Sequence, residues 1–354
     1  MKIKQVYKQL DVLFEEAERV KFEKNSKFVV FSDLHMGDGS SKDDFRSNAT
    51  LFENVLQKYY LPNDFGLILN GDVEELQRFP LKKIMSKWSY VFDIFKKFQA
   101  NGGIWKLLGN HDLTLVTEDQ NTYPMAYNEA LVLEHPSGEI FLFHGHQAST
   151  TYQKHNKLVG YTLKYLANPL RITNYSVAHD SRKQYAIEKK VYHHASFRKH
   201  MAIIGHTHRP LFESLSKPER LKYQIERLCR DFAREEKEDV KKSIKKLIKS
   251  KKKELKKIFK KNPNALNATQ LYNSIFHIPC LFNSGCTIGK RGITCLEIDH
   301  EKISLIHWFD KNVSDKYLKR KGYEPELIDD GHIFRMPINE EFLDYIFTRI
   351  RLLS

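Results

Sequence analysis

Five short segments of the chain each end an apolar run with side chains that can bind a metal ion or transfer a proton. In order along the chain, they are "VVFSDLH", "LILNGD", "IWKLLGNHD", "IFLFHGH" and "AIIGHTH". Their polar ends supply aspartate, asparagine and histidine, and none of them contains a cysteine. Carboxylate and amide oxygens combined with imidazole nitrogens suit manganese, iron or zinc. The five segments therefore predict a metal centre assembled from distant parts of the chain.

The first segment suggests why a buried run would end on polar side chains. Asp33 and His35 are two residues apart, and on an extended backbone side chains at that spacing point to the same side. We therefore expect both to bind one ion. A D-x-H pattern alone is common by chance, and "GD" after a strand usually marks a turn, whereas "GNHD" and "GHTH" are more specific because glycine permits a tight turn. The ordered set of five is what indicates a site.

The apolar runs are largely uninterrupted, which is typical of strands that are covered on both faces. Residues 43–60 and 80–98 separate the first three runs and have the pattern of helices. This strand–helix–strand alternation predicts a layered α/β fold, in which ligands lie beyond the carboxyl ends of the strands. Residues 292–310 alternate around a short polar turn, so we expect a hairpin and a mixed sheet.

The N-terminal segment predicts an amphipathic helix, because its apolar residues recur at helical spacing. These residues are Val6, Leu10, Leu13, Phe14 and Ala17. No run approaches the roughly 18 apolar residues of a membrane span, the N-terminal segment has no secretory apolar stretch, and the four cysteines have no CxxC spacing. These patterns favour a cytoplasmic protein with reduced cysteines.

Taken together, "DLH", "GD", "GNHD", "HGH" and "GHTH" resemble the five-block signature of the calcineurin-like metallophosphoesterase superfamily, over roughly residues 28–310. The resemblance implies an α/β (α+β) fold, a four-layer sandwich of two mixed β-sheets flanked by helices. It also implies a hydrolase that cleaves a phosphomonoester, phosphodiester or pyrophosphate bond by attack of a metal-bridging hydroxide. Two divalent metal ions would be the cofactors, with manganese favoured and iron or zinc as alternatives.

The resemblance also assigns the metal ligands. The first metal would be held by Asp33, His35 and His208. Asp72 matches the carboxylate that bridges both metals. The second metal would be held by Asn110, His144 and His206.

The same resemblance gives roles next to the metals. His111 matches a histidine that contacts the phosphate or protonates the leaving oxygen, and Asp112 would orient it. Asn110 would also contact the substrate. Arg209 directly follows "GHTH" and could reach a phosphate oxygen, with an exposed bystander as the alternative.

The chain departs from two branches of that superfamily. "GDVEELQ" stands where protein Ser/Thr phosphatases carry a "VDRG" stretch, so that branch is disfavoured. The "SDLH" start, "GHTHRP" and a helical stretch before the fifth segment favour the branch that resembles UDP-2,3-diacylglucosamine pyrophosphatase. That branch has "HGD" where this chain has His146, and arginine where this chain has His111, so the resemblance does not extend to the substrate of that branch.

We expect a single domain over residues 1–354 that contains two helical insertions. Residues 150–200 would form a cap-like insertion over the site, and its cationic side chains could meet an anionic substrate or could form a solvated helical face. These side chains are His179, Arg182, His193, His194 and Arg198. The second insertion, residues 217–262, is Lys-rich and helical. Residues 217–261 contain 19 Lys and Arg against 8 Asp and Glu, and so carry most of the net charge of +14.

Three functions remain open at this point. A small phosphorylated substrate is the partner that the site itself implies. The Lys-rich helices, residues 217–261, could instead bind nucleic acid in a nuclease-like enzyme, lie on an anionic membrane surface, or be only a solvated face. A non-catalytic scaffold on the same fold is disfavoured, because all seven ligand positions carry the expected residue type. The oligomeric state stays open.

Overall fold

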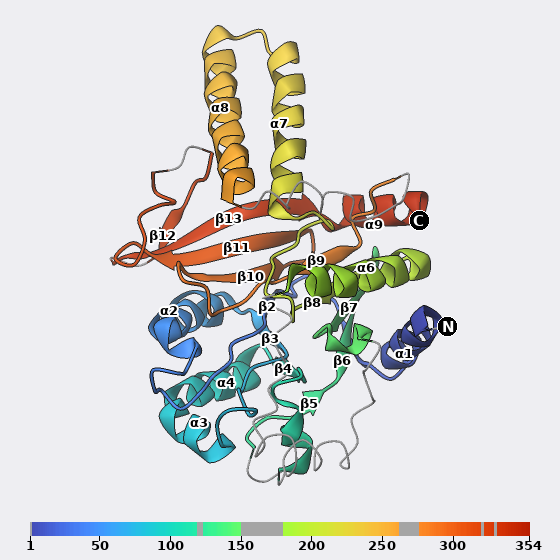
Figure 1. Ribbon diagram of the computed structural model, residues 1–354, viewed down its shortest axis with the longest axis vertical. Helices are drawn as coiled ribbons and strands as arrows, with labels where there is room; N and C mark the ends of the chain where they lie inside the picture. The colour runs from blue at the N-terminus through green and yellow to red at the C-terminus, as the bar shows by residue number, and fades with distance from the viewer. Residues whose placement is uncertain (1, 119–122, 150–179, 262–275, 320–321, 329–330) are drawn as a thin grey trace.

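Two mixed sheets form the centre of the computed structural model, and helices cover their outer faces (Figure 1). The structure describes residues 2–118, 123–149, 180–261, 276–319, 322–328 and 331–354. Within this part of the chain, the larger sheet has eight strands in the order β12-β13-β11-β10-β2-β3-β4-β5. Their bounds are β2 Phe28–Phe31, β3 Gly66–Asn70, β4 Ile104–Leu107, β5 Tyr127–Asn128, β10 Ile293–Ile298, β11 Lys302–Asp310, β12 Glu326–Ile328 and β13 Ile333–Phe342.

The smaller sheet has five strands among the described residues, in the order β1-β6-β7-β8-β9. Their bounds are β1 Glu18–Lys21, β6 Ala130–His135, β7 Gly138–Phe143, β8 Met201–Ile204 and β9 Leu281–Asn283. Strands β2, β3, β4 and β5 are parallel to one another in the larger sheet, and β7, β8 and β9 are parallel in the smaller one. The carboxyl ends of each parallel set therefore lie at one edge of its sheet.

Alternation along the strands separates two hydrophobic cores. In β2, Phe28 and Val30 belong to the core shared with the smaller sheet, whereas Val29 and Phe31 belong to the core beneath the helices of the other face. Phe31 packs edge-on against Phe52, with ring centroids 5.1 Å apart. Because side chains of a strand alternate between faces, a run of apolar residues such as Phe28–Phe31 supplies both cores at once.

Two groups of helices complete the layers (Figure 1). The larger sheet is covered by α2 Ala49–Val55, α3 Leu81–Lys87 and α4 Ser89–Asn101. The core that includes the smaller sheet is covered by α1 Lys2–Glu15, α6 Ser181–Arg198 and α9 Leu343–Leu353. Short 3-10 turns occur at Phe45–Ser47, Leu61–Asn63, Leu113–Thr117 and His146–Ala148, and a π-helical turn at Leu56–Tyr60. The predicted sandwich of two mixed sheets flanked by helices is confirmed.

The predicted helices are present but are divided more finely than the sequence indicated. The expected helix over residues 80–98 breaks at Trp88, whose backbone (φ −106°, ψ 26°) leaves the helical region. The indole of Trp88 is buried and donates to the carbonyl oxygen of Gly37 at 2.8 Å. Residues 43–60 likewise form a 3-10 turn, α2 and a π-helical turn. The hairpin predicted over residues 292–310 is formed by β10 and β11.

The first predicted insertion is described only from residue 180 onward, so residues 150–179, including His179, lie outside the described residues. Helix α6 packs into the core through Ile187, Val191 and Ala195. Two of the side chains offered to a substrate face α1 instead, because His194 and Arg198 both contact Asp11, at 2.9 Å and 2.6 Å. The expectation that these two meet the substrate is not supported by this geometry.

The Lys-rich segment forms two helices, α7 Lys217–Arg234 and α8 Glu238–Lys261, which project together from the sheet side that carries β13 (Figure 1). Lys251 of α8 donates to Gln224 of α7 at 2.9 Å, and Lys217 pairs with Glu254 at 2.7 Å. The helical prediction for this segment is confirmed. A search of the described helices finds none that combines the length and the hydropathy of a membrane span.

Candidate metal centre

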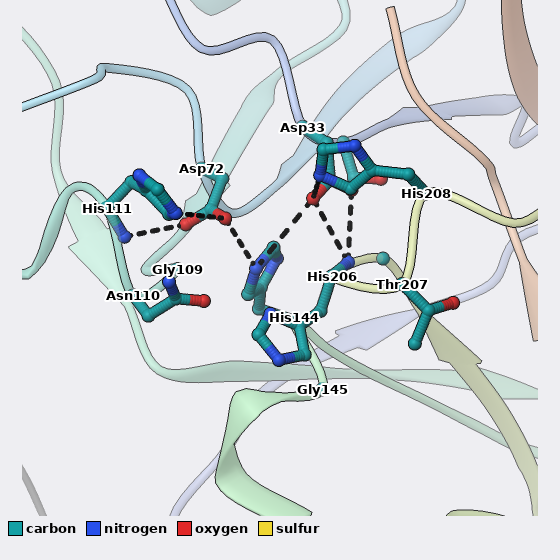
Figure 2. Close-up of polar contacts among 12 residues, drawn as sticks. Asp33, Asp72, Gly109, Asn110, His111, His144, Gly145, His206, Thr207 and His208 are labelled. Atoms are coloured by element: carbon teal, nitrogen blue, oxygen red, sulfur yellow. Dashed lines mark hydrogen bonds and ion pairs between the residues drawn. The ribbon is translucent and has the colours of Figure 1, made fainter. Parts of the chain in front are cut away.

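The loops that follow β2, β3, β4, β7 and β8 converge beyond the strand ends, and Figure 2 shows the side chains that they carry. Strands β2, β3 and β4 are parallel neighbours, as are β7 and β8. Five segments spread over some 180 residues of sequence are thus brought to one place by sheet topology, as expected for the ligand sites of α/β sheets.

The first group of candidate ligands combines Asp33, His35 and His208, whose donor atoms lie within 4.8 Å of one another. His208 Nε2 is 3.0 Å from Asp33 Oδ1. His35 Nε2 is 3.2 Å from His208 Nε2. Two imidazole nitrogens aimed at each other across a space that also contains a carboxylate oxygen form a natural cation site. The sequence prediction for this group placed the same three residues together.

The second group combines Asp72, His144 and His206, again with donor atoms within 4.8 Å of one another. His144 Nε2 is 3.0 Å from Asp72 Oδ2 and 4.0 Å from Asp33 Oδ1. Asp72 Oδ2 is also 3.9 Å from His35 Nε2, which belongs to the first group. Asp72 therefore lies between the two groups, where a bridging carboxylate would have to lie.

Asn110 and Arg209 have different surroundings. The side-chain oxygen of Asn110 is buried, and it has no hydrogen-bond partner among the described residues. Arg209 instead contacts the buried carboxylate of Glu188 on α6, with Nε 3.2 Å from Oε1. Asn110 thus offers a free ligand oxygen, whereas reaching a phosphate would require Arg209 to share or leave its contact with Glu188.

The backbone at the ligands is left-handed rather than extended. Asp33 and His35 have φ angles of 54° and 50°, Asp72 has 52°, and His206 and His208 have 62° and 53°. The extended backbone assumed for Asp33 and His35 is therefore wrong, although the two side chains do converge. Positive φ costs a non-glycine residue on the order of 1–3 kcal/mol, and such residues cluster at functional sites. Strain at five ligand positions indicates that the fold maintains this geometry for function.

Backbone amides fix the two carboxylates. Both oxygens of Asp33 accept from the His206 amide at 3.1 Å, and Asp72 Oδ1 accepts from the His111 amide at 2.8 Å. Two glycines make this approach feasible. A Cβ at Gly205 would come 2.6 Å from Asp33 Oδ2, and a Cβ at Gly109 would overlap Asp72. The glycines of "GNHD" and "GHTH" are thus required by close packing against the carboxylates.

Glu75 is a site residue that the sequence did not reveal. Its Oε2 lies 3.0 Å from His35 Nδ1 and its Oε1 lies 2.8 Å from His111 Nδ1. An ionised carboxylate only accepts hydrogen bonds, so both Nδ1 atoms carry a proton, and this leaves the His35 Nε2 lone pair free for a metal. A carboxylate that orients a metal-ligating imidazole in this way is a recurrent feature of metal sites. In the sequence, Glu75 is one of several acidic residues after "GD", and no pattern marked it.

Asp112 does not orient His111, contrary to the sequence prediction. Its carboxylate accepts from the amides of Gly109 at 2.6 Å and Val73 at 2.9 Å, and from Lys106 Nζ at 3.1 Å. Lys106 is fully buried and also donates to Glu74 at 2.5 Å. Asp112 thus holds the loop of "GNHD" in place from behind, while Glu75 contacts the imidazole ring.

The charge states follow from burial and from the neighbouring groups. Burial opposes ionisation of Asp72, but the imidazoles of His144 and His111 hold its pKa well below the usual range. Burial also opposes protonation of His144, yet the carboxylates of Asp72 and Asp33 raise its pKa to about 9. Burial lowers the pKa of His206 to about 3, so this imidazole is neutral. Without a cation, the carboxylate charges are balanced by protons on imidazole, which a metal would replace.

The residues present fit a pair of divalent cations. Two carboxylates, imidazole nitrogens and the unpartnered oxygen of Asn110 supply the oxygen and nitrogen donors that manganese, iron and zinc accept. The donor atoms form two neighbouring sets, and Asp72 lies between them.

Two mixed sheets carry, beyond their strand ends, a carboxylate–imidazole cluster that could hold metal ions. Comparison with family models is consistent with this: the calcineurin-like phosphoesterase model matches residues 26–240, which include all five ligand segments. The chain therefore belongs to the calcineurin-like phosphoesterase family, whose members are hydrolases acting on phosphoester bonds. No curated protein matches the chain.

Proposed function

We propose that this protein hydrolyses a phosphate ester or diphosphate bond of a small phosphorylated substrate, with two divalent cations, preferably manganese. The observation that carries the proposal is the position of Asp72, whose Oδ2 lies 3.0 Å from His144 Nε2 in its own ligand group and 3.9 Å from His35 Nε2 in the other. Cations held there would polarise the phosphoryl oxygens and lower the pKa of the attacking water.

His111 is the residue best placed to handle a proton. Its Nε2 lies 4.0 Å from Asp72 Oδ2, and its side chain is 15 % exposed, more than those of His35 and His144. Glu75 fixes the ring through Nδ1, so Nε2 is the atom that faces the cluster. A protonated Nε2 can donate to the departing oxygen, a contribution typically worth roughly 10²–10⁴-fold.

The substrate branch that we favour resembles the UDP-2,3-diacylglucosamine pyrophosphatases. Support comes from the "SDLH" and "GHTHRP" segments and from a helix, α6, that precedes the fifth segment and touches it through Gln184 and Glu188. His111 and His146 differ from that branch, so a related diphosphate substrate is proposed rather than the same compound.

The test is to load the protein with manganese and assay it against 4-nitrophenyl phosphate, bis(4-nitrophenyl) phosphate and a UDP-sugar. Metal analysis of the same sample should give two manganese ions per chain, and Asp72→Asn serves as the metal-deficient control. Hydrolysis of the UDP-sugar identifies the diphosphate reaction. Absence of hydrolysis of all three compounds by protein that holds two ions would overturn the proposal.

A nuclease-like activity is the second candidate, because one helix presents a row of exposed lysines. These are Lys242, Lys245, Lys246, Lys249, Lys252, Lys253, Lys256, Lys257 and Lys260 of α8. Binding through phosphate neutralisation should weaken by orders of magnitude between about 50 and 200 mM salt. Filter binding of single- and double-stranded DNA and RNA over that range tests this candidate. Anionic vesicles, assayed in the same salt series, test the membrane alternative.

A further inference from the structure

A cavity of about 690 Å³ adjoins the metal centre on the side of His208. It extends from His208 and Arg209 to the base of the α7–α8 pair, where Arg220 and Ile258 line it. The helices that project from the body in Figure 1 therefore contribute to the wall of a cavity that begins at a candidate metal ligand. A substrate held at the metal centre would have this space next to it.

The wall of the cavity is mainly apolar and aromatic. Tyr317, Tyr323, Met336 and Ile338 line it together with Ile258. The ring of Tyr317 packs against His307 with centroids 4.7 Å apart, which fixes this part of the wall. A wall of this kind suits a flat base or an alkyl chain better than a hydrated sugar or a bare phosphate.

Arg220 is the exception in this wall, because it is a buried cation without an ion pair. The residue is only 6 % exposed, Nη1 has no hydrogen-bond partner, and its guanidinium forms no ion pair with any described residue. The two carboxylates whose charge acts on Arg220 are already paired. Glu254 contacts Lys217 at 2.7 Å, and Glu213 contacts Arg349 at 2.7 Å. Burial lowers the pKa of Arg220 only to about 10, so the group stays charged at neutral pH.

A buried charge without a partner is costly, and proteins generally pair such groups or use them to bind a ligand. Arginine binds phosphate through two parallel N–H groups, which makes it well suited to an oxyanion in a low-dielectric cavity. Two further cations, Lys290 and Arg291, are exposed at the rim. The cavity thus combines an apolar wall with an unpaired cation and a cationic entrance.

We infer that this cavity receives the leaving group of the substrate, and that Arg220 binds a second phosphate carried by that group. The inference rests on the proposed function, because it takes the metal centre as the place of the phosphate that is cleaved. It specifies the substrate class as a compound with two phosphates whose far end is an aromatic base or an alkyl chain. After cleavage of a diphosphate bond, the product in the cavity is a monophosphate.

The test measures binding of that product by titration calorimetry to metal-free protein in excess chelator. The probes are uridine 5′-monophosphate and octyl phosphate, each compared with the parent alcohol, uridine or octanol, which lacks the phosphate. At least one of the two monophosphates should bind to the wild-type protein more tightly than its parent alcohol does. The tighter of the two identifies the far end of the substrate as a base or as an alkyl chain.

Arg220→Met should weaken monophosphate binding by about 10- to 100-fold, the value of one hydrogen bond to a charged group, and leave binding of the alcohols unchanged. Arg220→Lys should retain part of the affinity. Arg227→Met, on an exposed face of the same helix, is the matched control and should bind as the wild type does. Because burying an unpaired charge is costly, its removal should not lower the melting temperature of Arg220→Met.

Equal monophosphate affinity in Arg220→Met and wild type would overturn the inference, as would a large drop in its melting temperature, which would assign Arg220 a structural role. Absence of phosphate-dependent binding in the wild type would overturn it as well. These measurements need neither metal nor turnover. Failure of the manganese-loaded enzyme to hydrolyse any ester would therefore refute the proposed function while leaving an Arg220-dependent binding result intact.

Discussion

Replacing Glu75 with glutamine removes one negative charge and one hydrogen-bond acceptor from a place where two imidazole N–H groups meet. The carboxylate accepts from His35 Nδ1 at 3.0 Å and from His111 Nδ1 at 2.8 Å. Glu75 is buried, and despite that burial its bonds to His111 and His35 lower its pKa to about 2, so it is ionised at neutral pH. A glutamine of the same shape offers one acceptor, and its amide nitrogen must face the other ring.

The amide nitrogen opposes an N–H group, so one imidazole has to change tautomer. If His35 changes, its proton moves to Nε2, and the lone pair aimed at His208 and the first metal is lost. Each hydrogen bond to a charged group contributes about 1.5–3 kcal/mol. Loss of one bond corresponds to about 10- to 100-fold in metal affinity or turnover, the range typical of residues that orient metal ligands.

The assay is a manganese titration followed by calorimetry, together with turnover of bis(4-nitrophenyl) phosphate at saturating metal. Asp112→Asn is the matched control, because Asp112 contacts Gly109, Val73 and Lys106 but not the His111 ring. We expect Asp112→Asn to lower the free energy of unfolding more than Glu75→Gln does, with a smaller effect on metal affinity. If metal affinity falls in Asp112→Asn and is unchanged in Glu75→Gln, the assignment of the orienting carboxylate is wrong.

Three further predictions concern single residues of the site. Asp72→Asn should reduce bound manganese from two ions to one or fewer per chain, because Asp72 serves both ligand groups, and elemental analysis measures this. His111→Gln should retain its metal and slow an alkyl phosphodiester by roughly 10²–10⁴-fold but a nitrophenyl ester far less, since nitrophenolate leaves without a proton; equal losses on both esters would indicate electrostatic phosphate binding instead. Lys106→Met leaves Glu74 and Asp112 buried without their cation and should cost about 3–5 kcal/mol in urea unfolding; an unchanged midpoint would contradict the buried ion-pair network.

The sequence was sufficient for those features that depend on residue type and order. Apolar runs ending in Asp, Asn or His marked strands whose carboxyl ends meet, because parallel strands share one edge. Their order resembled one superfamily, and that prediction agrees with the family match over residues 26–240. The hairpin of β10 and β11 and the helices α7 and α8 followed from alternation and helical spacing.

Only the tertiary structure decided which of two adjacent glutamates serves the site. Glu74 contacts buried Lys106 at 2.5 Å, while Glu75 contacts the imidazoles of His35 and His111. The side chains of Glu74 and Glu75 point in different directions. Which of the two faces the metal centre depends on the conformation of the loop, and sequence spacing does not encode that conformation. The left-handed backbone at Asp33 and His35 likewise does not follow from sequence spacing, and in the fold the Asp33 carboxylate lies against Gly205.

The same distinction applies to charge. The sequence determined that residues 217–261 are strongly basic and helical, because composition and periodicity are local properties. It could not separate Arg220 from the other cations of that segment. Most of the lysines of α8 are exposed to solvent, whereas the guanidinium of Arg220 is buried in the wall of a cavity that reaches His208. The burial and pairing of Arg220 depend on contacts between α7, β13 and the loops around them. Only the folded chain brings these elements together.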